Sequence, residues 1–83
     1  MSANQDTADG WLVRSPSSLG DVIAHYRRAS GMTQEQLAER SGVHRSYLSE
    51  IERGHTTEHS EAVFRMLRRL GLDVVVRHHE GGS

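Results

Sequence analysis

The stretch TQEQLAERSGVHRSYLSEIERG, residues 33–54, constrains the fold of this chain more than any other part of it. Apolar residues recur at helical spacing on both sides of Gly42, and glycine tolerates the positive φ at which helices end. Ala38 is small where a helix ordinarily buries a larger side chain, so a second helix can approach closely there. The pattern predicts two short helices, 34–41 and 44–53, that cross at a large angle. Two helices joined in this way form a helix-turn-helix.

We expect the four larger apolar residues of this stretch to point into a core that both helices share. They are Leu37, Val43, Leu48 and Ile51. An earlier helix is predicted between Pro16, which suits a first helical position, and Gly31, which suits a helix end. Thr33 and Gln36 have the spacing of a capping box at the start of the next helix.

The C-terminal part of the chain is predicted to contain one more helix and one strand. Apolar residues recur on one helical face over roughly 60–70, and the β-branched residues of 72–77 alternate as in a strand. These patterns divide the chain into a flexible leader, 1–13, a helix-turn-helix domain, 14–71, and a strand with a flexible tail, 72–83.

Composition limits the classes of protein to which the chain can belong. It has 83 residues, no cysteine and a formal net charge of −1, and its basic residues other than histidine are all arginine. The lack of cysteine excludes disulfides and thiolate metal sites. The sequence shows neither an apolar run of membrane-spanning length nor a signal-peptide pattern, so we expect a cytoplasmic protein.

The chain resembles the Cro/C1, or XRE, type of helix-turn-helix protein. The resemblance rests on R-x-x-x-G-x-T-Q-x-x-L-A at 27–38, followed by SGV and YLSEIERG, and it extends over 19–70. It implies a mainly α, phage-repressor-like domain of four to five helices. A finer resemblance, of SPSSLGDVIAHYRRASGMTQEQLA and FRMLRRLGLDVVV, is to HipB-type antitoxins. In that group one C-terminal β-strand follows the fourth helix and pairs with its copy across a dimer.

The XRE resemblance implies roles for individual residues at a DNA surface. The third helix would lie in the major groove and read bases through Arg45, Ser46, Ser49 and Glu50. Phosphate contacts would come from Thr33, Gln34, His44, Tyr47, Arg53 and His55. For Tyr47, a packing role with its hydroxyl in water is the alternative. The resemblance also pairs Arg27 with Glu52 as a structural ion pair between the first and third helices.

The strand after the fourth helix provides a separate argument for a dimer. One strand of about six residues is not stable alone, and the other extended candidate, 11–14, is short. We therefore expect the strand to pair antiparallel with its copy across a two-fold axis. That homodimer would set two reading helices about one DNA turn apart, or a multiple of it, on a palindromic operator. The dimerising residues would be Leu72, Val74, Val75 and Val76.

Together these features predict a dimeric, sequence-specific repressor that binds double-stranded DNA and regulates its own operon. The HipB resemblance implies an antitoxin that inhibits a HipA-type kinase toxin by holding it. Two alternatives stay open. One is a stand-alone XRE regulator without a toxin, and the other is a protein-binding adaptor, which Glu50, Glu52 and the slight negative charge keep open. An enzyme is not expected, because no nucleophile with its base, phosphate loop or metal cluster is recognisable. No cofactor, metal or small-molecule substrate is indicated.

Overall fold

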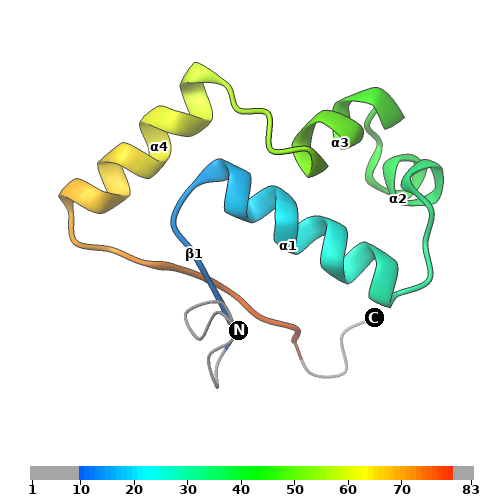
Figure 1. Cartoon of the computed structure of the whole chain (residues 1–83), viewed down its shortest axis with the longest axis horizontal. Coiled ribbons are helices and arrows are strands. Elements are labelled where there is room, and N and C mark those ends of the chain that lie inside the picture. The colour runs from blue at the N-terminus through cyan, green and yellow to red at the C-terminus, as the bar shows by residue number, and fades with distance from the viewer. Residues whose placement is uncertain (1–9, 80–83) are drawn as a thin grey trace.

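The computed structural model describes residues 10–79 of the chain (Figure 1). This part contains four helices and a two-stranded antiparallel sheet, so the mainly α fold predicted from the sequence is confirmed. The elements in chain order are β1 (Trp11–Val13), α1 (Pro16–Ala29), α2 (Gln34–Ser41), α3 (Arg45–Glu52), α4 (Glu58–Arg69) and β2 (Val74–Val76). The predicted flexible segments at 1–9 and 80–83 lie outside the described residues. No described helix is both long and apolar enough to span a bilayer.

Side-chain hydrogen bonds explain where α1 and α2 begin. The hydroxyl of Ser15 accepts from the backbone N–H of Ser18 at 3.1 Å, immediately before Pro16. At α2, Thr33 accepts from the backbone of Gln36 at 3.1 Å, and the Gln36 side chain accepts from the backbone of Thr33 at 2.9 Å. This pair is the predicted capping box, and it satisfies two backbone donors that helical hydrogen bonds leave free.

The start of α4 differs from its predicted position near residue 60. Thr57 and Ser60 bond each other's backbone N–H groups, each at 3.1 Å, and form a second capping box. Ser60 is therefore the third residue of α4, and the helix begins at Glu58. The sequence pattern of apolar residues misses this polar first turn, because the turn is fixed by its cap and not by burial.

The core lies between α1, α4 and the sheet. Val13, Val22 and Phe64 form its buried centre, and six partly buried residues pack against them: Trp11, Leu19, Tyr26, Leu67, Val74 and Val76.

Around the helix-turn-helix, Ala38 and Leu48 are buried, whereas Leu37 and Ile51 are half-buried. Val43 is 39% exposed, so the prediction that it points inward is wrong. It lies in the turn just after Gly42, where the chain is still on the surface.

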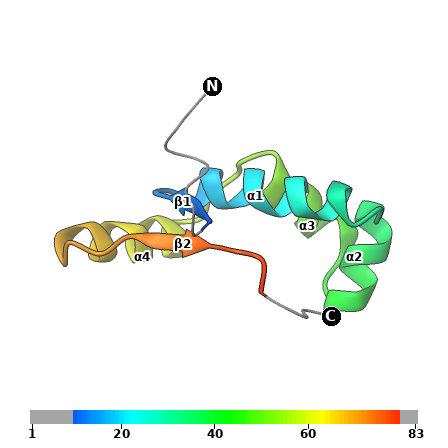
Figure 2. The same cartoon turned by 90° about the horizontal axis from the view of Figure 1, so that it is seen from below.

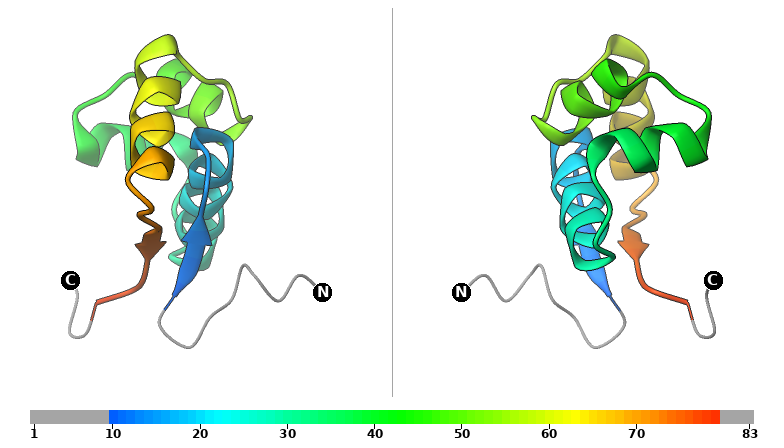
Figure 3. Two further views of the ribbon diagram at one scale, coloured as in Figure 1. Left: turned by 90° about the vertical axis from the view of Figure 1, so that its left-hand side faces the viewer. Right: turned by 90° about the vertical axis from the view of Figure 1, so that its right-hand side faces the viewer.

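The two strands pair within the chain, which corrects two predictions. Trp11 lies opposite Val76 and Val13 opposite Val74, so their side chains share the inner face of the sheet. Val13 is only 1% exposed. The strands lie side by side in Figures 2 and 3. The premise that β2 lacks a partner in its own chain is therefore wrong. Residues 11–13, which were predicted to belong to a flexible leader, form a strand.

Candidate nucleic-acid interface

Close packing and a tight turn set the angle between α2 and α3 (Figure 1). Ala38, on the inner side of α2, is 2% exposed. Gly42 ends α2 in the left-handed conformation, at φ 73° and ψ 29°, and the next backbone N–H, of Val43, donates to the carbonyl of Ala38 at 3.0 Å. A side chain at Gly42 would meet nothing within 4 Å, so glycine is needed there for its conformation and not for space.

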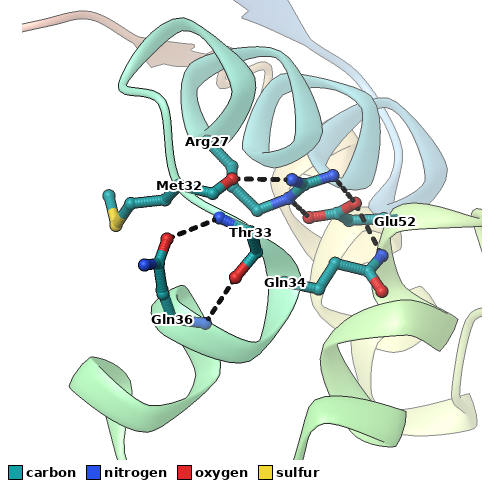
Figure 4. Close-up of polar contacts among 6 residues, drawn as sticks. All are labelled: Arg27, Met32, Thr33, Gln34, Gln36 and Glu52. Carbon is teal, nitrogen blue, oxygen red and sulfur yellow. Dashed lines mark hydrogen bonds and ion pairs between the residues drawn. The ribbon is translucent and has the colours of Figure 1, made fainter.

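A network of charged and polar groups ties α3 to α1 and α2 (Figure 4). The guanidinium of Arg27 donates from Nε to Glu52 Oε2 at 2.7 Å and from Nη2 to Glu52 Oε1 at 2.9 Å. Its third nitrogen, Nη1, donates to the carbonyl of Met32 at 2.9 Å. Gln34 Nε2 donates to Glu52 Oε1 at 3.0 Å. One carboxylate on α3 thus binds both other helices, and the ion pair implied by the XRE resemblance is present.

The ion pair at the centre of this network is largely shielded from water. The side chain of Glu52 is 5% exposed and that of Arg27 is 12% exposed. The hydrogen bonds from Arg27, joined by that from Gln34, hold the pKa of the Glu52 carboxyl below its ordinary value. The same bonds raise the pKa of Arg27. Both groups are therefore charged at neutral pH, and each needs the other, because a buried charge without a partner is costly.

The outer face of α3 is polar and open. Arg45, Ser46 and Glu50 are exposed, whereas Ser49 is half-buried. The guanidinium of Arg45 makes no hydrogen bond or ion pair with any described residue, so all its donors remain available. Arg53, just past the end of α3, donates to the hydroxyl of Ser49 at 3.3 Å. The four predicted base-reading residues therefore lie on one short helix, with one cation and one anion at its surface.

The predicted phosphate-binding residues lie at the start of α2 and on or next to α3. His44 caps α3 without a side-chain hydrogen bond, and Arg53 follows its last turn. They are nine residues apart, which corresponds to about 13.5 Å at the usual helical rise per residue. Tyr47, 56% exposed, borders an apolar groove with Ile51, and exposed His55 lines the same groove. This placement is compatible with either role considered for Tyr47.

At α2, Thr33 is exposed and Gln34 is half-buried. Because the amide nitrogen of Gln34 donates to Glu52, Gln34 has a structural role that the sequence did not suggest. Its amide has a second hydrogen, so this bond does not prevent a phosphate contact. It does hold the side chain in one orientation at the start of the helix.

Gly20 is a further residue that sequence reasoning missed. A Cβ atom at this position of α1 would lie 2.0 Å from the backbone carbonyl oxygen of Ile51 on α3. Only glycine allows the two backbones to approach this closely. A glycine inside an otherwise helical pattern was the available signal, because it lowers helix stability and needs a packing reason. Gly20 sets the position of α3 from the side opposite to the turn.

Comparison with known proteins identifies the family. Residues 18–79 match the family described as a helix-turn-helix domain. The chain belongs to this helix-turn-helix family. The matched region runs from α1 through β2, so it contains the α2–α3 pair and every residue of the network around Glu52.

Three curated relatives of this helix-turn-helix chain carry informative names. An uncharacterized HTH-type transcriptional regulator, y4dJ of Sinorhizobium fredii (strain NBRC 101917 / NGR234), is 35% identical over 57 residues, 69% of this chain and 74% of that protein. The HTH-type transcriptional regulator SlrR of Bacillus subtilis (strain 168) is 54% identical over 39 residues, which are 46% of this chain and 26% of SlrR. Control protein C.SmaI of Serratia marcescens is 46% identical over 35 residues, 42% of each chain. No solved structure gives a significant match.

These similarities agree with an XRE-type helix-turn-helix. They do not show the similarity to HipB-type antitoxins. None of the three relatives is named as an antitoxin. The chain spans about a quarter of SlrR and less than half of C.SmaI. What those two proteins do is therefore not transferred to this chain by the similarity.

Proposed function

We propose that this protein is a sequence-specific, DNA-binding transcriptional regulator that represses its own operon. The observation that carries the proposal is the free guanidinium of Arg45 on the exposed face of α3, a helix whose position is fixed by Glu52 and Gly20. An α-helix fits the major groove of B-form DNA, where base edges are distinguishable. The membership in the helix-turn-helix family and the names of the three relatives support the same function.

In this proposal each part of the surface contributes a different kind of contact. The fork of Arg45 reaches the O6 and N7 acceptors of a guanine, and Glu50 accepts from a cytosine amino group or repels a wrong sequence. Ser46 and Ser49 make shorter-range contacts beside them. The groups at the helix ends bind phosphates and set the register without reading sequence. As in other proteins of this architecture, a homodimer reads two half-sites of a palindrome.

Replacing Arg45 with alanine is expected to abolish the preference of the protein for its own promoter. The lost fork contact corresponds to about 1–3 kcal/mol of discrimination, or roughly 5- to 150-fold in affinity for the specific site. Arg77→Ala is the matched control, because Arg77 is also exposed but follows β2. Fluorescence anisotropy with promoter and scrambled duplexes at one fixed salt concentration measures both variants.

The outcome of that titration also separates the regulator from the protein-binding adaptor. If the wild-type protein binds promoter and scrambled duplexes equally at moderate salt, the proposal is wrong and the adaptor becomes the better account. A stand-alone regulator and an antitoxin both predict the preference, so they require a different experiment.

The finer part of the proposal is that the protein is a HipB-like antitoxin whose partner is a HipA-type kinase toxin. It rests on the resemblance of the two quoted segments, which form α1 with the start of α2 and the end of α4 with β2. The expected result is a kinase-like gene adjacent to this one, whose product forms a stable complex with this chain during co-expression and size-exclusion chromatography. A neighbourhood without such a gene would leave the stand-alone regulator.

A further inference from the structure

The apolar groove beside Tyr47 lies between α1 and α3. Its walls include Leu19 and Ile23 of α1 and Tyr47 and Ile51 of α3, and each pair is four residues apart and so lies on one side of its helix. The connection from α3 to α4 completes the groove with residues 55–57, and it passes over the start of α1 in Figure 1. The groove holds about 240 Å³, slightly less than most small-molecule sites. It therefore has room for a molecule of about one ring.

Glu50 supplies a negative charge to this groove. It is exposed, and its carboxylate makes no hydrogen bond or ion pair with any described residue. Arg53, the next cation along the chain, donates to the hydroxyl of Ser49 and not to Glu50. No arginine is among the described residues that line the groove. A cation that enters the groove would thus find an unpaired carboxylate.

The ring of Tyr47 favours a cation as well. Tyr47 precedes Glu50 by three residues on α3, so the two side chains are neighbours on the helix surface. Its side chain is 56% exposed and lines the groove, and the face of an aromatic ring attracts a positive charge. His55 adds an imidazole, which in its neutral form accepts a hydrogen bond from an ammonium group. Charge and ring thus select the same kind of head group, and the apolar walls select a hydrocarbon body.

We propose that this groove binds a small organic ammonium ion whose apolar body is about one ring in size. The ammonium group pairs with the carboxylate of Glu50 beside the ring of Tyr47, and the body covers Ile23 and Ile51. Glu50 would repel a phosphate of the DNA backbone, so that backbone is a poorer occupant. An apolar side chain of another protein would cover the Glu50 carboxylate without providing a partner for its charge, which is costly.

The consequence of this binding for regulation rests on the proposed function. Tyr47 and His55 are also predicted to contact phosphates, and Glu50 is predicted to face a base. A bound ammonium ion would occupy groups that the DNA needs, so the ion and the operator exclude each other. By this coupling the amine relieves repression.

Isothermal titration calorimetry of the full chain without DNA tests the site with phenethylamine. Phenethylamine is expected to bind roughly tenfold more tightly than phenethyl alcohol, which has the same body but no charge, and than ethylamine, which has no ring. Glu50→Gln should weaken the amine roughly fivefold, because it removes one exposed ion pair. Glu39→Gln, an exposed carboxylate of α2 outside the groove, is the matched control and should bind as the wild type does.

Two substitutions of Tyr47 separate the ring from the hydroxyl. Tyr47→Phe should keep the affinity for phenethylamine, whereas Tyr47→Ala should lose roughly tenfold. Backbone amide shifts in nuclear magnetic resonance spectra should change at residues 47–57 and 16–23. No binding of the amine, equal binding of the alcohol, a Glu50→Gln protein with wild-type affinity, or shifts centred elsewhere would each overturn the site.

Anisotropy titrations with the promoter duplex test the regulatory part. Saturating phenethylamine should lower the affinity of the wild type for the promoter roughly tenfold, whereas phenethyl alcohol at the same concentration should not. An unchanged promoter affinity in the presence of bound amine would overturn the regulatory part. A wild-type protein without promoter preference would contradict the proposed function but leave the calorimetric result in place, so the two proposals fail separately.

Discussion

Replacing Gly20 with alanine is expected to destabilise the protein by about 3 kcal/mol, the upper part of the range for overpacked cores. The new Cβ would lie 2.0 Å from the carbonyl oxygen of Ile51, so α1 and α3 would have to separate. The atom in the way belongs to the backbone and cannot rotate aside. Small domains have only a few kcal/mol of stability, so urea denaturation followed by circular dichroism should show a much lower midpoint.

The sign of the stability change in Gly20→Ala distinguishes a packing effect from an effect of helix propensity. In an exposed helix position, glycine to alanine stabilises by about 1 kcal/mol. Asp21→Ala is the matched control, since Asp21 is the next residue of α1 and is exposed. The control should change the midpoint little. A Gly20→Ala protein as stable as the wild type would show that the two helices do not approach as closely as described.

Replacing Glu52 with alanine is expected to cost about 3 kcal/mol, the lower part of the range for breaking a buried ion pair. The loss arises because Arg27, whose side chain is 12% exposed, would keep its charge without a carboxylate. Gln34 would lose its partner on α3 as well. Urea denaturation measures the change, and DNA binding should weaken together with stability, because the network sets the position of the reading helix.

A double variant separates the ion pair from the volume of its side chains. Arg27→Met/Glu52→Met removes both charges while keeping two side chains of similar length, so it should be clearly more stable than Glu52→Ala. If the double variant is as unstable as the single one, packing and not charge accounts for the loss.

The stability of the protein in acid should also depend on the hydrogen bonds of Glu52. Because the pKa of Glu52 is lower in the folded protein than in the unfolded chain, folding favours its ionised form. Its stabilising contribution is complete above roughly pH 4.5, the ordinary pKa of a glutamate, and is lost as the pH falls through the lowered value. The stability of Glu52→Gln, measured across this range, should therefore fall less steeply with acid than that of the wild type.

Much of the helical architecture could be read from the sequence because its signals are local. The capping box of Thr33 and Gln36 depends on residues three apart, and the helix end at Gly42 depends on the conformation of one residue. The ion pair of Arg27 and Glu52 spans 25 positions and came from the family resemblance, not from the pattern of residues.

The predictions from the sequence that are wrong have a different cause. Val43 follows a correct turn, but whether it is covered depends on which helices lie near it, and in the structure it stays 39% exposed. The start of α4 was missed because its first turn is polar and held by Thr57 and Ser60. That Arg45, Ser46, Ser49 and Glu50 read bases stays a prediction, and the free guanidinium of Arg45 is visible only in the tertiary structure.

The sequence by itself determined the helix-turn-helix, because caps, turns and small residues act on neighbours within one or two turns of the chain. Only the tertiary structure decided how the two extended segments, 11–13 and 74–76, are used. The pairing of Trp11 with Val76 joins residues at opposite ends of the described chain, and it forms because both strands cover Phe64 and Val22. The same is true of Gly20, whose backbone meets Ile51 only once α1 and α3 have packed. Contacts of this kind depend on where whole elements lie, and no local pattern specifies that.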